Sequence, residues 1–318
     1  MTTDGQSGRY GRLRLLFWNQ NEKRVRAFWR ILGAVVVALL VPSLLNSVVV
    51  RPLDLPIALT GFMSNGIAAL VAIGVAAGWA RYIDRRPFRE YGFSLSGRWW
   101  RTLALGGLVG LLGWGGALAT SLALDWASVT AIFSPGTGDF PFLLSVSLFT
   151  LAYVFVGFWE ETIFRGIVMR NAIEGLDIAS VSDRTALVGG WVLSSVLFGA
   201  LHFGQATSPL ALMFWILAGL ILGLAYLLTD ELAIPIGLHF AFDFSANNVF
   251  GLANVRDVGS EIPMILRPAF SGPDIFVGLS GVVNTSWLVV IGALSITVIK
   301  WQYGALRAQI ESYTRPEG

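Results

Sequence analysis

Six ionisable side chains in this sequence lie within, or at the end of, long apolar segments. They are Glu160, Glu161, Arg165, His202, His239 and Asp243. A charged group in the middle of a membrane span costs about 2.5–3.5 kcal/mol on insertion scales, so such residues indicate function by default. The chain has two histidines, both in this set, and no cysteine, which excludes disulfides, thiolate metal sites and cysteine nucleophiles. Carboxylates and imidazoles together can act as general acids and bases or as metal ligands.

The spacing of these residues separates a structural pair from a free carboxylate. Glu161 and Arg165 are four residues apart with the glutamate first, which is the favourable order for an ion pair on a helix. Glu160 points about 100° away around the helix and lacks that partner. We therefore expect Glu160 to be available for chemistry. Phe198 precedes His202 by four residues, so its ring can pack beside the imidazole.

Each of these features also has a purely structural interpretation. A single intramembrane histidine often forms a hydrogen bond between helices. A Glu–Arg pair at this spacing is more often a structural bridge than a site, and Asp243 can simply orient His239. The occurrence of the whole set on three predicted helices favours a functional interpretation.

The elements that must position these residues are membrane spans. Of 318 residues, 55% are hydrophobic and 13% are charged, against about 25% charged in a soluble domain. This composition excludes a soluble enzyme, a disordered chain and a nucleic-acid binder. It predicts an all-α, polytopic transmembrane helix bundle. About eight windows are long enough to span, since a span needs about 20 apolar residues: 31–50, 57–80, 102–124, 141–159, 185–203, 209–228, 232–250 and 276–299.

Two of these windows carry further information. The window 141–159 resumes after its two glutamates, so we expect one long, tilted helix that reaches about residue 173. The window 102–124 is rich in glycine, and Gly219 and Gly223 are four residues apart in a later window. Small residues allow close helix packing in membranes, which is the role we assign to these glycines.

The basic residues predict the orientation of the bundle. With eight spans, all but three of the 22 Lys and Arg residues fall on one side; the exceptions are Arg51, Arg256 and Arg267. The positive-inside rule places both termini in the cytoplasm. We expect a multi-pass protein of a bacterial or archaeal plasma (inner) membrane, with the lipid bilayer as a partner and no nucleic acid.

The segments outside the spans are less informative. The Arg-rich start is not a cleavable signal peptide, because no apolar stretch of the needed length occurs in its first 30 residues. Leu13–Leu32 is either partly an interfacial segment on the inner leaflet or an ordinary basic tail. We interpret Asp125–Pro141 as a plain connector, and 251–275 as a longer outer loop with mixed charges.

Three short motifs in this chain resemble those of one family. Phe158–Gly166 contains Glu-Glu-x-x-x-Arg, Phe198 and His202 form Phe-x-x-x-His, and His239 and Asp243 form His-x-x-x-Asp. Together they resemble the CPBP (CAAX protease and bacteriocin-processing) family of intramembrane proteases, which are relatives of the type II CAAX prenyl endopeptidase. The likeness covers about 141–250.

The resemblance implies four parts in the chain: a basic cytoplasmic segment (1–30), helices one to three (31–140), a catalytic core of helices four to seven (141–250), and an outer loop, last helix and cytoplasmic tail (251–318). It also implies a polar cavity within the membrane. There Glu160, helped by His202, would activate a water for peptide hydrolysis, while His239 and residue 243 would serve the oxyanion. Glu161, Arg165 and Phe198 would support them.

One position departs from the family pattern and bears on the cofactor. The family often has asparagine where this chain has Asp243. An ionised aspartate cannot donate a hydrogen bond to an oxyanion, so it must be protonated or serve as a ligand. Glu160, His202, His239 and Asp243 are acceptable ligands for Zn²⁺ or another divalent metal. This departure slightly favours a metal-assisted mechanism, without deciding between the two versions.

The predicted spans place the two histidines at different depths in the membrane, which conflicts with a shared site. His239 lies about seven residues from the cytoplasmic edge of its window and His202 about 17 residues from that edge, a difference of roughly 15 Å. The catalytic hypothesis requires the fifth span to start deeper, to be broken or to tilt strongly. It also requires the two rings to lie within about 10 Å of each other.

Three functions are compatible with the sequence. The first is an intramembrane endopeptidase of glutamate or metallo type that acts on a membrane-embedded peptide or protein, with a prenylated target implied only by the relatives. The second is a proton- or ion-coupled transporter, although no broken helices occur in two matching halves. The third is a non-catalytic membrane scaffold or immunity factor.

Overall fold

The computed structural model describes residues 15–20, 22–136, 140–205, 208–253, 262–304 and 306, and these are helical apart from two pairs of strands. The α-helices are α2 (Ala27–Leu45), α3 (Ile57–Gly78), α4 (Gly97–Ala123), α5 (Phe142–Glu161), α6 (Arg170–Leu176), α7 (Asp183–Leu201), α8 (Pro209–Thr229), α9 (Ala233–Phe244) and α10 (Val282–Tyr303). Serine side chains cap the first turns of α4, α7 and α8, where Ser96, Ser182 and Ser208 each accept a bond from a backbone N–H.

Shorter helical segments extend or connect these helices. The π-helical segments are η1 (Asn46–Val50), η3 (Trp79–Ile83), η5 (Thr162–Met169) and η7 (Ser245–Val249). The 3-10 turns are η2 (Arg51–Leu53), η4 (Phe88–Tyr91) and η6 (Phe203–Gln205). The strands are β1 (Trp18–Asn19), β2 (Arg24–Val25), β3 (Ala127–Ser134) and β4 (Met264–Phe270).

Within the described ranges, seven helices are long and apolar enough to cross a membrane. One of them is continuous from Phe142 to Leu176 through α5, η5 and α6, as the long fourth window predicted. The remaining window, 232–250, corresponds to α9, which has 12 residues, and η7, which has five. Nine of the 12 residues of α9 are buried, so this helix lies inside the bundle and is shorter than a full span.

Large apolar side chains cover the outside of the bundle. Leu40, Val48, Leu70, Leu143 and Met213 are each more than 60% exposed. A water-facing surface of this kind would be an aggregation liability, whereas lipid favours it. The chain is an integral, multi-pass, all-α membrane protein, as its composition predicted.

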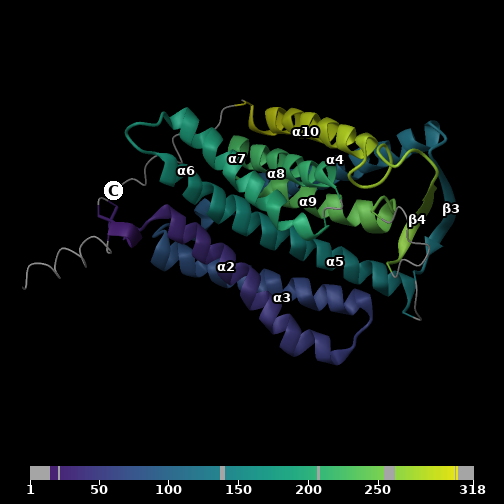
Figure 1. Cartoon of the computed structure of the whole chain (residues 1–318), viewed down its shortest axis with the longest axis horizontal. Helices are drawn as coiled ribbons and strands as arrows, with labels where there is room; N and C mark the ends of the chain where they lie inside the picture. Colours follow the sequence, from purple (N-terminus) through teal and green to yellow (C-terminus); the bar gives the residue numbers. More distant parts are fainter. Residues whose placement is uncertain are drawn as a thin grey trace, which may run out of the picture.

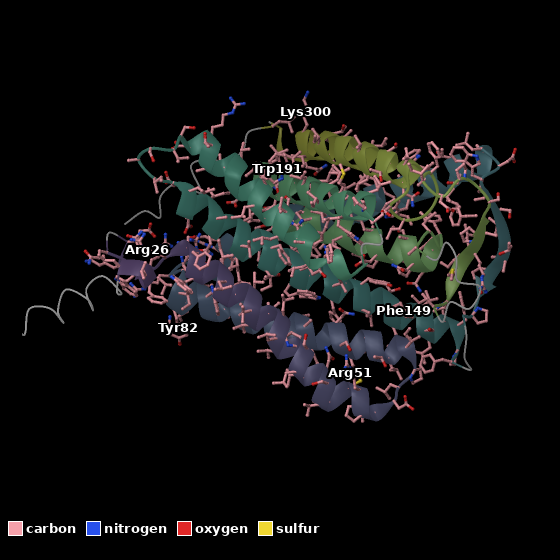
Figure 2. All side chains as sticks on the ribbon, in the orientation of Figure 1. Arg26, Arg51, Tyr82, Phe149, Trp191 and Lys300 are labelled. Atoms are coloured by element: carbon pink, nitrogen blue, oxygen red, sulfur yellow. The ribbon has the colours of Figure 1, made fainter. Side chains whose placement is uncertain are left out.

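The two ends of the bundle differ in structure (Figure 1). At one end β3 pairs antiparallel with β4, from Ala127 opposite Phe270 to Ser134 opposite Met264. We call this the strand end. The opposite end, where α2 begins and α6 ends, is the arginine end. Figure 2 shows Arg26 at the arginine end and Arg51 toward the strand end.

The strands correct the interpretation of two predicted loops. Asp125–Pro141 is not a plain connector, since it contains β3, and 251–275 contains its partner β4. The sequence analysis missed this pairing because the partners are more than 130 residues apart and neither strand alternates strictly between polar and apolar residues. Residues 137–139 and 254–261 of these loops lie outside the described residues.

The basic N-terminal segment differs from an ordinary tail over its described part. β1 pairs antiparallel with β2, and Arg24 and Arg30 are 6% and 2% exposed. Both bind the Glu174 carboxylate, at 3.1 and 3.0 Å. The segment is thus packed on the bundle and not a free tail. The predicted positions Arg9, Arg12, Arg14, Arg256, Arg307 and Arg315 lie outside the described residues.

These arginines belong to a buried ionic cluster that closes the arginine end. Arg86 also pairs with Glu174, and Arg30 lies 3.2 Å from Asp84. Burial alone would lower the pKa of Arg86, but the carboxylates of Glu174 and Asp84 raise it above its ordinary value. The guanidinium therefore stays charged in this setting.

Tyr91 and Asn171 complete the hydrogen bonding of the same cluster. The Tyr91 hydroxyl donates to Asp84 Oδ2 at 2.6 Å, and the Asn171 amide donates to the same oxygen at 2.9 Å. Burial, together with the neighbouring Asp84 carboxylate, raises the pKa of Tyr91. The phenol therefore stays protonated and remains a donor near neutral pH.

Glycines bring α4 and α9 into direct backbone contact, as the packing interpretation predicted. A Cβ on Gly237 would lie 2.0 Å from the Leu103 carbonyl oxygen, and one on Gly106 would lie 2.7 Å from the Ile234 carbonyl oxygen. Gly219 is equally close to α7, with the Ser195 carbonyl oxygen 2.9 Å from its Cβ position. The α4 contact sets the position of α9, which carries two of the predicted site residues.

We expect Gly237→Ala to destabilise the protein by about 1–3 kcal/mol, because the added methyl must push α9 away from the backbone of α4. His239 is two residues away, so activity should fall as well. Gly74→Ala is the matched control, because a Cβ there meets nothing within 4 Å. Thermal unfolding in detergent should show a lower midpoint for Gly237→Ala alone. Equal midpoints for both variants would contradict the close packing of α4 and α9.

Candidate active site

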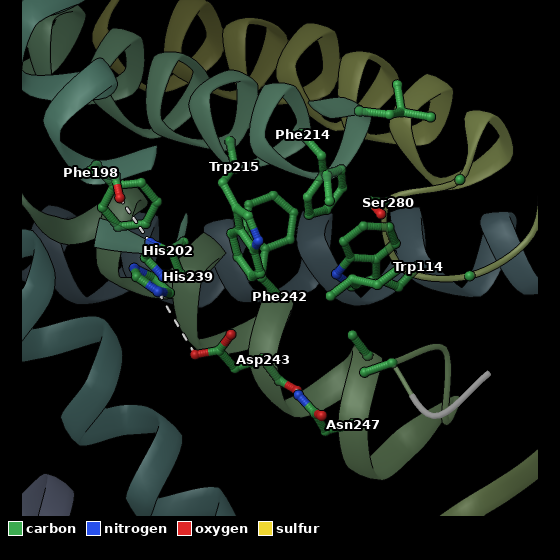
Figure 3. Close-up of a pocket in the computed structure, with 18 of the residues that line it drawn as sticks. Trp114, Phe198, His202, Phe214, Trp215, His239, Phe242, Asp243, Asn247 and Ser280 are labelled. Atoms are coloured by element: carbon green, nitrogen blue, oxygen red, sulfur yellow. Dashed lines mark hydrogen bonds and ion pairs between the residues drawn. The ribbon is translucent and has the colours of Figure 1, made fainter. Parts of the chain in front are cut away.

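All four predicted catalytic residues line one cavity of about 1190 Å³. Glu160 comes from the last turn of α5, His202 directly follows α7, and His239 and Asp243 lie on α9. Figure 3 shows both imidazoles and Asp243 at this cavity, with Trp114, Phe214 and other aromatic side chains along its wall. The tertiary structure thus brings together residues that are up to 83 positions apart in the sequence.

A change of helix type directly follows both acidic positions. The α-helix α5 ends at Glu161 and continues as the π-helix Thr162–Met169. In the same way, α9 ends one residue after Asp243 and continues as the π-helix Ser245–Val249. π-Helical turns are rare and occur frequently at functional sites. They change the direction of the following side chains relative to an ideal helix, which the sequence pattern did not indicate.

Glu161 is the centre of a buried hydrogen-bond network. Its Oε1 atom accepts from Arg165 at 2.9 Å, which is the predicted ion pair, and from His239 Nδ1 at 2.7 Å. Arg165 also donates to the Gly219 carbonyl oxygen at 3.1 Å and lies 4.4 Å from the centre of the Phe198 ring. This network holds α5, α7, α8 and α9 together beside the cavity.

Whereas Oε1 of Glu161 binds Arg165 and His239 and only its Oε2 atom is left without a partner, Glu160 makes no direct hydrogen bond to an arginine or histidine. Its side chain is buried, yet its Oε2 atom has no hydrogen-bond partner. His202 Nε2 lies 4.0 Å and His239 Nε2 lies 3.8 Å from this oxygen. These gaps are too long for direct hydrogen bonds but suit a single water that bridges the groups with legs of about 2.8 Å. The carboxylate expected to be available for chemistry is therefore the one without a partner.

The tautomer of His202 follows from its backbone contact. His202 Nδ1 lies 2.8 Å from the Phe198 carbonyl oxygen, which can only accept, so Nδ1 carries the proton. In a neutral ring, Nε2 then has a lone pair that faces Glu160. The ring is held by Phe198, whose centroid is 4.6 Å away, and by Trp215, which stacks on it at 4.4 Å. The predicted contact with Phe198 is confirmed.

His239 is oriented in a similar way by a carboxylate. Its Nδ1 donates to Glu161, and its Nε2 faces Glu160 on one side and Asp243 Oδ2, at 3.7 Å, on the other. Whenever Nε2 also carries a proton, it can donate into the cavity. This is the geometry needed to bind an oxygen that develops negative charge.

The conflict of depth is resolved mainly by the turn before α9. Both Nε2 atoms lie within 4.0 Å of the same Glu160 oxygen, so the rings meet the 10 Å limit. Thr229, Glu231 and Leu232 in this turn are all less than 9% exposed, and the Leu232 N–H donates to the Gly92 carbonyl oxygen. Because the turn is sunk into the bundle, α9 starts below the surface and His239 lies deeper than its window predicted.

The donor atoms have the right chemistry for zinc but not the spacing. Ligands bound to Zn²⁺ at about 2.0–2.2 Å in a tetrahedron lie about 3.3–3.6 Å from each other, whereas His202–Glu160, His239–Glu160 and His239–Asp243 are 3.7–4.0 Å apart. In the described part of the chain, no group of three or more His, Asp or Glu residues is placed so that it could hold a metal ion. As they stand, these residues fit a bridging water and not a metal.

Some residues of the cavity have no signal in the sequence. Trp215 on α8 stacks on His202, and Tyr153 on α5 and Asn65 on α3 also line the cavity. Each of these residues lies in an apolar window without a motif. These residues reach the site because of the way their helices are rotated and packed in the bundle. That arrangement cannot be seen in the sequence of one helix.

Comparison with known families addresses the resemblance directly. Residues 142–245 match a family described as Rce1-like, type II CAAX prenyl endopeptidase Rce1-like. This segment is Rce1-like. It covers about a third of the chain and includes all four cavity residues discussed above, so the predicted resemblance of this segment to the CPBP intramembrane proteases is confirmed. No curated protein and no solved structure matched the chain.

The Rce1-like match also supports a general class of activity. A CAAX-type intramembrane endopeptidase needs polar groups in a cavity among membrane helices, and the cavity described above provides them. The flanking helices α2, α3, α4 and α10 lie outside the matched residues, although α3 and α4 contribute to the cavity wall.

Proposed function

We propose that this protein hydrolyses a peptide bond of a membrane-associated substrate with a water activated by Glu160. The observation that carries the proposal is the unpaired Oε2 atom of buried Glu160, within 4.0 Å of two imidazole nitrogens. Unlike Glu161, Glu160 has no arginine within ion-pair distance. The Rce1-like match of the surrounding segment supports the same assignment. That the substrate is prenylated rests only on the family description.

In the proposed mechanism, the water donates one hydrogen to Glu160 Oε2 and the other to His202 Nε2. Glu160 takes the first proton as the water oxygen attacks the carbonyl carbon of the substrate, which forms a tetrahedral oxyanion. Glu160 then passes this proton to the peptide nitrogen, and the C–N bond breaks. The products are a carboxylic acid and an amine, and transfer of the acid's proton to the amine gives a carboxylate and an ammonium group. General-base catalysis of this kind contributes about 10²- to 10⁴-fold to the rate.

The oxyanion would be bound by His239 and Asp243. A protonated His239 Nε2 donates directly, and Glu161 stabilises the charge of the ring through Nδ1. Asp243 can contribute a second donor only in its protonated form, because an ionised carboxylate is acceptor-only. The chain has aspartate where the family often has asparagine, and this makes Asp243 the residue whose replacement is most informative.

We expect Asp243→Asn to retain peptide hydrolysis within about tenfold of the wild type and to make the rate less dependent on pH. The amide can donate to the oxyanion at any pH, whereas Asp243 loses its proton, and with it the donated hydrogen bond, as the pH rises. The measurement is a pH–rate profile of peptide cleavage in proteoliposomes. Complete loss of cleavage would assign Asp243 a role as a base or ligand.

The same variant separates the protease from a transporter. A proton-coupled transporter would need the titratable carboxylate at this depth and would lose flux with Asp243→Asn. Proton flux into liposomes can therefore be measured beside cleavage. Flux that is present in the wild type and absent in Asp243→Asn would favour transport over proteolysis.

Metal assistance is the alternative version of the mechanism, and metal analysis tests it. From the spacing of the donors, we expect less than about 0.1 zinc per chain in purified protein and no effect of a chelator on cleavage. The comparison is wild type against His239→Ala. Stoichiometric zinc that is lost in His239→Ala, together with inhibition by the chelator, would replace the bridging water with a metal-bound one.

A further inference from the structure

The cavity of the site extends from Glu160 toward the strand end of the bundle only. Its deepest described residues, Glu160 and Phe198, are buried. The lining continues along the first turns of α8 and the last turn of α9 to the loop before α10, where Pro209 and Ile275 are exposed. Ile275 is 58% exposed. Each of these elements leads from the site toward the end that carries β3 and β4 (Figure 1).

The arginine end is closed beneath the site. Ile163, Ile167, Tyr226 and Leu232 lie on this side of Glu160 and are each 0 or 1% exposed. Beyond them, Arg170 pairs with Asp230 at 2.6 Å, and the buried cluster around Asp84 and Glu174 follows. None of these residues lines the cavity. A substrate could not pass through this layer without breaking several buried ion pairs, each of which is costly to break.

The basic residues identify which face of the membrane each end meets. Among the described Lys and Arg residues, those in loops and at helix ends gather at the arginine end, and only Arg51 and Arg267 belong to the strand end. The positive-inside rule therefore assigns the arginine end to the cytoplasm and the open end of the cavity to the opposite face.

The cavity wall also restricts the chemistry of its occupant. The described lining residues include three carboxylates (Glu160, Asp243 and Asp274) and no Lys or Arg. The wall is otherwise rich in aromatic side chains, including Trp114 and Phe214. Aromatic faces accept apolar and cationic groups. A substrate with a free terminal carboxylate in the cavity would meet three carboxylates with no Lys or Arg to pair with, and the two imidazoles of the site already face Glu160.

We propose that the site takes an apolar or basic peptide segment that enters from the extracytoplasmic face of the membrane. Cleavage of that segment rests on the function proposed above, whereas the side of access is an independent property of the fold. The occupant is an internal segment near the outer membrane surface and not a chain end that carries its carboxylate into the cavity.

The absence of cysteine makes the side of access directly measurable. Ser280→Cys places a thiol at the cavity mouth, and Ser180→Cys places one in the exposed loop between α6 and α7 at the arginine end. Sealed vesicles of known orientation are treated with a membrane-impermeant maleimide, and protease digestion of an N-terminal epitope identifies the cytoplasmic face. Ile275→Cys is a second, more exposed mouth position if Ser280→Cys folds poorly.

We expect the mouth thiols to be labelled from the face opposite the epitope and the Ser180→Cys thiol from the same face as the epitope. Labelling of a mouth thiol from the epitope's face would overturn the proposal, and it would leave the chemistry of Glu160 untouched. This readout needs no activity. Loss of the proposed protease function and failure of the access proposal are therefore distinguishable.

Two cleavage measurements test which kind of peptide the cavity binds. A bulky maleimide on Ser280→Cys should slow cleavage at least tenfold relative to the same unlabelled variant, whereas labelled Ser180→Cys should be unaffected. Matched peptides with Lys or Glu beside the scissile bond should differ at least tenfold in kcat/KM, in favour of Lys. Equal rates, or preference for Glu or for a free terminal carboxylate in the cavity, would contradict the proposed substrate chemistry.

Discussion

Glu160→Gln should reduce peptide hydrolysis by about 10²- to 10⁴-fold and leave the fold intact. Glutamine has the same shape as glutamate, but its amide cannot take a proton from water. Because Glu160 Oε2 has no hydrogen-bond partner in the protein, the substitution breaks no bond of this oxygen. Replacing a buried carboxylate with a neutral amide also removes a desolvation cost. Stability should therefore be unchanged or slightly raised.

The measurement is kcat/KM in proteoliposomes combined with thermal unfolding of the same preparations. Glu90→Gln is the matched control, because Glu90 is exposed in the η4 turn, far from the cavity, and should retain full activity. Turnover of Glu160→Gln within twofold of the wild type would remove Glu160 from the mechanism. A large loss of stability would instead assign it a structural role.

Arg165→Met should destabilise the folded protein by about 3–5 kcal/mol, the cost expected when one partner of a buried ion pair is removed. Arg165 is 0% exposed and is bonded to Glu161 and to the Gly219 carbonyl oxygen. Without it, the Glu161 carboxylate keeps only the bond from His239 and stays buried with an uncompensated charge. This variant should also lose activity, since Glu161 orients His239.

The double variant Glu161→Gln/Arg165→Met separates charge from packing. It removes both charges, so it should recover a large part of the stability lost by Arg165→Met, and the difference measures the coupling between the two side chains. Arg184→Met, at an exposed position in the first turn of α7, is the control and should change stability by less than about 0.5 kcal/mol. Equilibrium unfolding in mixed micelles provides the free energies. Additive effects of the two substitutions would contradict a direct pair.

Residue types and short spacings explain why much of the site was predictable. The Glu161–Arg165 pair and the contact of Phe198 with His202 are both local, four-residue relations on a helix, and both are confirmed. The spans were predictable because a bilayer requires about 20 apolar residues whatever their partners. The glycines of α4 were predictable because close approach of helices requires small side chains.

Other features depend on contacts between distant segments. The β3–β4 pair joins residues more than 130 positions apart, and the ionic cluster joins Arg24 and Arg30 to Glu174 across the bundle. Neither leaves a periodic trace in the local sequence. The hydrogen bond from His239 to Glu161 also joins distant segments of the chain. Through this bond, the Glu161–Arg165 pair, which the spacing alone indicated as structural, becomes part of the site.

Hydropathy, charge and helical spacing are properties of single segments. The amino-acid sequence was therefore enough to predict a polytopic helical membrane protein with a small set of acidic and imidazole groups on its fourth, fifth and seventh windows. Three features became visible in the assembled bundle alone: the turn before α9 is buried in the bundle, Glu160 lacks the hydrogen bonds that Glu161 receives, and the cavity opens at the strand end. Depth, pairing and access are set by how the helices pack against each other, and no single helix carries that information.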